Sequence, residues 1–345
     1  MPRNFLWALT IALVGLAAAG PAAAADRGDR LERFRELAAS RLGLSQILTT
    51  ESPAEAYREI YALLDDEIVE SLASGGPFAS LAFLQDRLDT FADAWGGATL
   101  HMVRAGEVMV GAFVLDERSA GNSVRVYGRL PGEGATMLSA LYREGRPTVY
   151  TLPGSRDAVI VTWEGMASGW GTRPLRVELL RRQGDQVHVA WSTAELFTDG
   201  LQARSWSVQG RDVRIRYQLR YPGWSPGCEA QTEQEDVYRL AIGAPVLRVS
   251  RTEHDAWHRD LHATVERLLA AVAARDESTL GALVPDRALR ARLPATLKDE
   301  PACDGREGAA GEVRVAAEAE GQPWTLTFRR QGGRWRLTAA ARVLQ

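Results

Sequence analysis

Apolar and polar residues alternate on both sides of two short turn sequences, QGDQ at 183–186 and QGRD at 209–212. The flanking segments, RVELLRR before the first turn and VHVAW after it, place every second side chain on the same face of an extended chain. A glycine beside a polar residue between two such segments is typical of a tight β-hairpin. The pattern therefore predicts antiparallel hairpins.

Similar β-rich runs, separated by glycine, aspartate and asparagine, continue from Thr99 to Ser250. We expect roughly ten to twelve strands in an all-β antiparallel domain over 96–252, arranged either as a sandwich or as a propeller-like stack. The glycine-containing segment PGEGATM at 131–137 lacks the third glycine of a dinucleotide-binding fingerprint. We interpret this segment as a turn.

Residues 26–95 have a helical pattern. Ala56, Ile60, Leu63, Leu64 and Ile68 recur at spacings of three and four, and Ser52 followed by proline is typical of a helix start. A helical N-terminal segment that packs on the β domain is expected. Together with the C-terminal part described below, the predicted fold is an α+β multidomain protein.

The first 25 residues resemble a secretory signal peptide. Arg3 precedes an apolar run, and small residues lead to Ala25, after which cleavage is expected. The apolar run is shorter than the ~20 residues that a spanning helix needs. Among the basic residues only Lys298 is a lysine, an arginine bias that we attribute to a GC-rich bacterium. The predicted location is periplasmic or secreted, with no membrane span after signal cleavage.

The charge balance limits the partners. The chain has 41 basic and 44 acidic residues, a formal net charge of −3, and no long basic run. Nucleic acid, whose phosphates demand clustered positive charge, is therefore not an expected partner. The remaining candidates for a binding partner are an extracytoplasmic protein and a glycan. We expect no cofactor.

The two cysteines, Cys228 and Cys303, lie beside proline and glycine. In an oxidising compartment such an isolated pair forms a disulfide, because no CxxC motif indicates a metal or redox role. The bond would close a loop of roughly 75 residues and stabilise the fold by about 4 kcal/mol. It would join the β domain to the C-terminal module.

The C-terminal residues 253–345 predict a helix from about Glu253 to Ala274, a short helical stretch at 278–293 and three strands. The last hairpin carries Gly333, Trp335 and Leu337. In these features the segment resembles the small NTF2-like modules of bacterial secreted proteins. The resemblance implies a small α+β module but no activity.

Three of the five histidines fall in HDAWHRDLH, residues 254–262. On one helix His254 and His262 would lie about 12 Å apart along the axis, too far to share a metal ion. His258 and a neighbour four residues away could share one, but the sequence identifies no third ligand. We therefore interpret the segment as a packed helix face with Trp257 and Leu261 buried, and we predict no metal.

The pattern GWSPG at 223–227 matches the G-x-S-x-G motif of serine hydrolases. In that motif the residue after the serine donates its backbone N–H to the oxyanion hole. Here that residue is Pro226, which has no N–H. The segment is therefore expected to be a turn, and no catalytic residue is predicted from it.

Two functions remain after these exclusions. The favoured one is a non-catalytic binding or accessory protein whose ligand-binding residues are Tyr221, Trp224 and Glu229, because aromatic rings beside polar groups can hold a sugar or a peptide. The alternative is a hydrolase of envelope polymers that uses carboxylates in 229–236. An enzyme should bring two of these carboxylates together in a cleft with raised pKa values.

Overall fold

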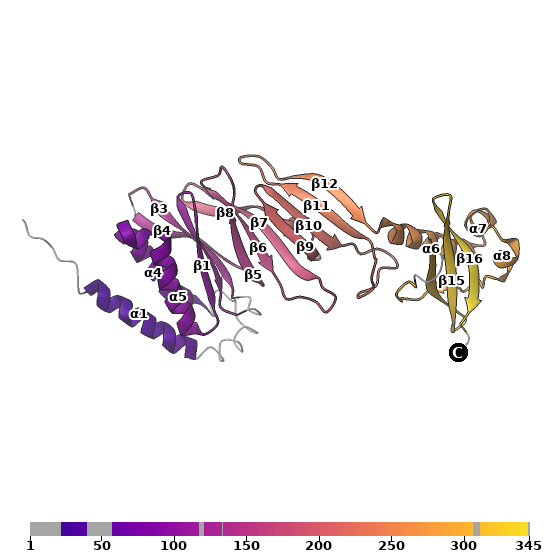
Figure 1. Ribbon diagram of the computed structural model, residues 1–345, viewed down its shortest axis with the longest axis horizontal. Coiled ribbons are helices and arrows are strands. Elements are labelled where there is room, and N and C mark those ends of the chain that lie inside the picture. Colours follow the sequence, from indigo (N-terminus) through magenta and orange to yellow (C-terminus); the bar gives the residue numbers. More distant parts are fainter. Residues whose placement is uncertain (1–21, 40–56, 117–120, 133, 306–310, 344–345) are drawn as a thin grey trace, which may run out of the picture.

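The computed structural model confirms the α+β multidomain organisation, with helices at the N-terminal end, antiparallel sheets in the middle and a small module at the C-terminal end (Figure 1). It describes residues 22–39, 57–116, 121–132, 134–305 and 311–343. Most of the predicted signal peptide lies outside these residues, and Ala22–Ala25 belong to the first helix. Among the described helices, none combines the length and apolar character needed to cross a bilayer.

In the part of the chain that the structure describes, the N-terminal layer consists of α1 (Ala22–Ala39), α4 (Arg58–Ser74), the short 3₁₀ helix η1 (Gly76–Ala79) and α5 (Leu81–Trp95). The start of α5 is capped by Ser80, whose hydroxyl oxygen accepts a hydrogen bond from the backbone N–H of Phe83 at 3.2 Å. Gly96 ends this helix in the left-handed region, at a φ of 74°. The helix start predicted at Ser52 lies outside the described residues.

The first sheet has the order β1-β2-β3-β4. Its strands are β1 (Thr99–Ala105), β2 (Val108–Val114), β3 (Ser123–Leu130) and β4 (Gly134–Tyr142). The prediction that 131–137 is a turn was wrong for its second half, because β4 begins at Gly134 and pairs with β3. Residues 134–142 lack a clear alternation of buried and exposed positions, so their strand conformation depends on the hydrogen bonds that β3 supplies.

The second sheet has eight strands in the order β12-β11-β10-β9-β7-β6-β5, with β8 paired to β7. These strands are β5 (Arg146–Thr151), β6 (Ala158–Glu164), β7 (Arg173–Gln183), β8 (Gln186–Ser192), β9 (Gln202–Gln209), β10 (Asp212–Gln218), β11 (Glu233–Arg239) and β12 (Leu247–His254). The hairpins predicted around QGDQ and QGRD are β7–β8 and β9–β10. With β1–β4, the described residues hold twelve strands between Thr99 and His254, within the predicted number.

The two halves of the second sheet pack face to face. They are joined at β7 and β9 by only two residue pairs, Arg173 with Ala203 and Pro174 with Gln202. Rings on strands that are not neighbours in the sheet, Trp191 of β8 and Tyr238 of β11, have centroids 5.4 Å apart. The β region is therefore a stack of sandwich-like layers, and of the two predicted alternatives the sandwich is observed.

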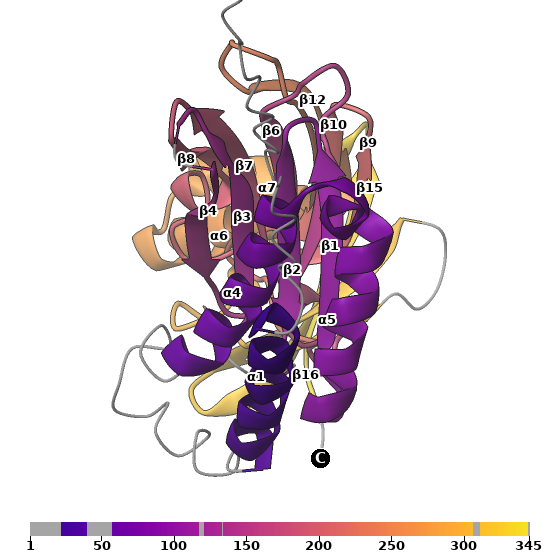
Figure 2. The same cartoon turned by 90° about the vertical axis from the view of Figure 1, so that its left-hand side faces the viewer.

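Each pair of layers has its own apolar core. The N-terminal helices cover one face of β1–β4 (Figure 2) and bury Phe113 and Tyr127. The other face of β1–β4 packs on β5–β8 through Val110 and Val161, whereas Ile215 of β10 belongs to the core between the two halves of the second sheet. A sheet that lies between two other layers is packed on both faces, so its strands carry apolar side chains on both faces.

The C-terminal module packs three helices on a four-stranded sheet of order β13-β14-β15-β16. Its elements are α6 (Ala256–Ala274), α7 (Glu277–Leu283), α8 (Arg287–Arg292), β13 (Lys298–Asp299), β14 (Glu312–Ala319), β15 (Gln322–Gln331) and β16 (Arg334–Arg342). The predicted apolar stripe of α6, including Leu261, Val265 and Leu268, is buried in the module core with Phe328.

Cys228 and Cys303 form a disulfide, as predicted, with their Cα atoms 5.2 Å apart. Cys228 lies between β10 and β11, and Cys303 follows β13, so the bond joins the second sheet to the C-terminal module. Disulfides persist in oxidising compartments, and this one is compatible with an extracytoplasmic location.

Candidate functional site

The loop RYPGWSPGC, residues 220–228, is tightly held between β10 and β11. Its two turns are closed by backbone hydrogen bonds, from Trp224 to Tyr221 and from Cys228 to Ser225. The amide of Gln231 crosses the loop, accepting from the N–H of Ser225 at 2.8 Å and donating to its carbonyl at 2.6 Å. This loop contains GWSPG, so the prediction that the motif is a turn is confirmed.

The three residues predicted to bind a ligand differ in how far they are exposed to solvent. Glu229 is exposed, whereas Trp224 is half-buried with the guanidinium of Arg220 5.7 Å from its ring centroid. The hydroxyl of Tyr221 accepts from the N–H of Thr232 at 3.0 Å and lies 2.6 Å from Nδ1 of His258. Tyr221 therefore faces the C-terminal module, and a ligand role for these residues stays a prediction.

The carboxylates of the alternative hydrolase are spread over both faces of β11. Glu233 and Glu235 share one face, as predicted, while Asp236 lies on the other. Glu233 pairs with Arg204 and Arg216, and Glu235 pairs with Arg214. Within the described residues these carboxylates hold arginines in a structural network, and they do not converge in a cleft.

Asp236 has the environment of a buried ion pair. Burial alone would raise the pKa of this carboxyl, but hydrogen bonds from Arg251 and Tyr217 hold it below its ordinary value. A general acid that works near neutral pH needs a raised pKa. The direction of the shift at Asp236 is therefore opposite to the one that the hydrolase alternative requires.

The histidine segment does not form one continuous helix. The helix was predicted to start at about Glu253, but β12 extends to His254 and α6 begins only at Ala256. Asp255 makes the corner in the left-handed region, at a φ of 50°. This correction takes His254 off the helix, because strand pairing with Glu233 outweighs the helical pattern at this position. Trp257 is half-buried and Leu261 is buried.

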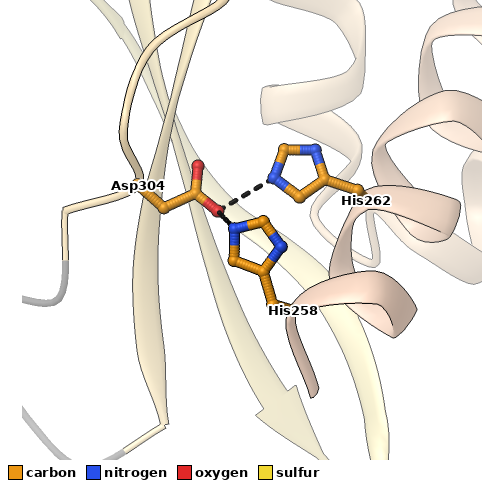
Figure 3. Close-up of side chains that lie close together, drawn as sticks. All are labelled: His258, His262 and Asp304. Atoms are coloured by element: carbon orange, nitrogen blue, oxygen red, sulfur yellow. Dashed lines mark hydrogen bonds and ion pairs between the residues drawn. The ribbon is translucent and has the colours of Figure 1, made fainter. Parts of the chain in front are cut away.

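His258 and His262 lie one turn apart on α6 and point toward the carboxylate of Asp304 (Figure 3). Nε2 of His258 is 3.1 Å from Oδ2 of Asp304, and Nε2 of His262 is 2.9 Å from the same oxygen. All three side chains are at most 5% exposed. The packing of His258 on a buried face was predicted, whereas His262 was expected at the edge of that face, and the common carboxylate partner was missed.

The disulfide is the signal that could have found Asp304. Asp304 follows Cys303 directly, so bonding Cys303 to Cys228 brings the carboxylate to the loop that also carries Tyr221 and Gly223. Gly223 fits closely against the second histidine, since a Cβ atom added to it would lie 1.7 Å from Nδ1 of His262. Residues from three separate segments thus meet at one buried point between the second sheet and the module.

A cleft of about 590 Å³ opens at the end of the second sheet, distant in sequence from every predicted site residue. It is bordered by the β6–β7 connection and by the segment 193–202, and its walls combine apolar and polar side chains. Residues that line it include Trp163, Met166, Leu175, Arg176, Ala194 and Phe197. Met166 is 56% exposed at the cleft, so its side chain is available for contact with a ligand.

Polar groups lie under one wall of this cleft. The indole N–H of Trp163 donates to Glu178 at 3.0 Å, and Nε of Arg176 is 2.7 Å from the other oxygen of that buried carboxylate. These contacts fix the tryptophan ring and leave an arginine at the cleft. An apolar wall with a few fixed polar groups is the usual composition of a site for a small ligand.

The comparisons with known proteins give the chain no relatives. No protein-family model matches it, and no curated protein matches its sequence. Any functional conclusion therefore rests on the residues and geometry described above.

Proposed function

We propose that this chain is a non-catalytic binding protein of the bacterial periplasm or exterior, and that its ligand occupies the cleft beside Trp163. The volume of the cleft carries this proposal, because sites for small molecules range from about 300 to 1,000 Å³. The signal-like first 25 residues and the disulfide support the location. The arginine-paired carboxylates of β11 favour binding over hydrolysis.

The lining of the cleft indicates the class of ligand. Met166, Phe197 and Leu175 provide apolar contacts, and Arg176 provides a positive charge. A small amphipathic molecule with an apolar body and an anionic group satisfies both. Arg176 already neutralises Glu178 in part, so the apolar contacts supply most of the affinity.

The C-terminal residues 253–345 are included in the proposal as an NTF2-like module. Support comes from α6, which packs along the antiparallel sheet through Leu261, Val265 and Leu268. In this arrangement the module is an accessory unit that is anchored to the ligand-binding sheets through Cys228.

Titration with the fluorescent anion 1-anilinonaphthalene-8-sulfonate tests the cleft, because this probe combines an apolar body with a sulfonate. Ala194→Glu narrows the cleft and repels the sulfonate, and Met166→Asp makes the apolar wall polar. We expect each to weaken probe binding at least about tenfold, which corresponds to about 1.4 kcal/mol. Both residues are exposed, so the fold should tolerate these changes.

Ile242→Asp is the matched control. This residue is 43% exposed in the β11–β12 connection and does not line the cleft. The probe should bind the control variant as it binds the unmodified protein. Equal affinity of the probe for the control, Ala194→Glu and Met166→Asp proteins would contradict the proposal.

A further inference from the structure

We propose that His258, His262 and Asp304 bind one divalent transition-metal ion, for which Zn²⁺ has the best-matched chemistry, at the junction of the second sheet and the C-terminal module. The inference goes beyond ligand binding in the cleft and does not depend on it. It also replaces the sequence-based expectation of no metal, which was made without a third ligand in view.

The donor atoms have the right kind and separation. Nε2 of His258, Nε2 of His262 and a carboxylate oxygen of Asp304 all lie within 4.8 Å of one another. Ligands about 2.0–2.2 Å from a central zinc ion lie at such separations from each other. Two imidazoles and one carboxylate are an established set of three protein ligands for zinc, in which a water molecule completes the tetrahedron. The i, i+4 spacing of the histidines turns both rings toward the same side of α6.

The groups behind the ligands fix the ring orientations. In the tautomer that leaves Nε2 of His258 free for a metal, Nδ1–H donates to the hydroxyl oxygen of Tyr221, 2.6 Å away. That oxygen is held in turn by the N–H of Thr232. Metal-bound histidines commonly donate their second N–H to such an acceptor, and this partner sets which nitrogen faces the metal.

Close packing against the loop 220–228 fixes the orientation of the His262 ring. Gly223, at a φ of 80°, lies so close to Nδ1 of His262 that no other residue type fits there without moving the ring or the loop. The loop that carries Gly223 is held by Gln231 and by the disulfide of Cys228. Both rings are therefore held in place before any ion binds, which lowers the entropic cost of binding.

Charge and burial point to a structural ion. Asp299 is near enough to His262 and Asp304 to interact with them electrostatically, so the site has more acidic groups than the single ligand carboxylate. A divalent cation offsets this charge. The three ligand side chains are at most 5% exposed, which leaves a substrate no path to the ion. The ion would link α6 and the segment after Cys303 beside the second-sheet loop that carries Tyr221.

The test is a titration of the full mature protein, free of any histidine tag and with its disulfide intact, with ZnCl₂ after removal of metals by a chelator. Calorimetry should show one ion per chain with a Kd below about 1 µM, as buried structural zinc sites reach. Co²⁺ should bind at the same place and give the intense visible absorption of a tetrahedral complex. Weaker binding by the unmodified protein, or more than one equivalent site, would overturn the proposal.

Variants separate this site from nonspecific zinc binding. His258→Gln, His262→Gln and Asp304→Asn should each weaken zinc binding at least about 100-fold, and Tyr221→Phe about tenfold, as for loss of a group that orients a ligand. His254→Gln and His188→Gln are matched controls and should bind like the unmodified protein. Circular dichroism verifies that each variant is folded. Unchanged zinc affinity in folded His262→Gln or Asp304→Asn protein would refute the assignment.

Discussion

The N-terminal helices and the C-terminal module are attached to the β layers in different ways. The helices bury large apolar side chains against β1–β4, among them Tyr61, Phe91 and Phe113. The module meets the second sheet through one disulfide and a small polar cluster around Asp304. The helical layer is thus part of a continuous core, whereas the module is a separate unit held by a few specific links.

A buried ion pair adds to the helical interface. The guanidinium of Arg125 on β3 binds the carboxylate of Asp65 on α4, and its side chain is only 4% exposed. The same guanidinium lies 4.7 Å from the ring centroid of Tyr61. Because breaking a buried pair leaves an uncompensated charge, this contact orients α4 on the sheet and opposes sliding of the helix. The two ends of the molecule should therefore unfold with different cooperativity.

The largest expected effect follows from removing a ring from the helical interface. Phe113→Ala should lower the free energy of unfolding by about 3–5 kcal/mol, because the residue is fully buried between helices and sheet. Chemical denaturation measures this loss. The control, Phe78→Ala, removes the same side chain from a position that is 44% exposed, and it should change stability by less than about 1 kcal/mol. Similar losses in both variants would contradict a continuous core.

Removing the disulfide tests the junction. The disulfide links residues 75 positions apart and stabilises the fold by about 4 kcal/mol, because it lowers the entropy of the unfolded chain. Replacing both Cys228 and Cys303 by serine should remove this stabilisation. We expect this loss to appear in the unfolding of the C-terminal module, while the transition that is sensitive to Phe113→Ala shifts by less than about 1 kcal/mol. Hydrogen exchange measures the stability of the C-terminal module separately from that of the helical layer and its sheet. An equal shift of both would show that the molecule unfolds as one unit.

The third expected effect is confined to alkaline pH and is small just above pH 10. Burial raises the pKa values of Tyr61 and Tyr127 well above the ordinary value. Above pH 10 the unfolded chain loses these protons and the native protein keeps them, so the free energy of unfolding falls with rising pH. The slope is about 1.4 kcal/mol per pH unit for each tyrosine, until the native pKa is reached. Below pH 10 this contribution to stability is fully present.

The double variant Tyr61→Phe and Tyr127→Phe measures this slope. Its free energy of unfolding should fall less steeply above pH 10 than that of the unmodified protein, with unchanged slopes between pH 7 and 9. Both residues lie in the helical interface, so the reduced slope should appear in the transition that Phe113→Ala also shifts. Identical alkaline slopes in the two proteins would mean that these hydroxyl groups are ionised in the native state.

Much of the fold could be predicted because its signals are local. The hairpins at QGDQ and QGRD, the apolar stripe of α6 and the pairing of the two cysteines follow from residues close in sequence or from their number. Strand β4 was missed because its pattern of side chains is weak without β3 beside it. His254 was misplaced because its spacing from His258 fits a helix, although pairing with β11 makes it a strand residue.

The candidate sites could be predicted only in part. The sequence indicated that His258 packs inside, and it pointed to Tyr221 and Trp224 as a fixed loop. It did not show that Asp304 would join the histidines, since 42 residues separate Asp304 from His262. The cleft beside Trp163 could not be predicted either, because the residues that line it come from separate segments that only the folded sheets bring together.

The sequence by itself determined the antiparallel β content, the helical ends, the disulfide and the absence of a usable N–H at Pro226, because periodicity, cysteine number and residue chemistry act over short distances. Long-range packing sets which face of α6 meets a carboxylate, which carboxylates are neutralised by arginine, and where a cleft remains open. Those outcomes depend on how layers stack and on which loops the disulfide draws together. Contacts between segments far apart in the chain arise from packing of the whole molecule. Short sequence patterns carry no information about these contacts.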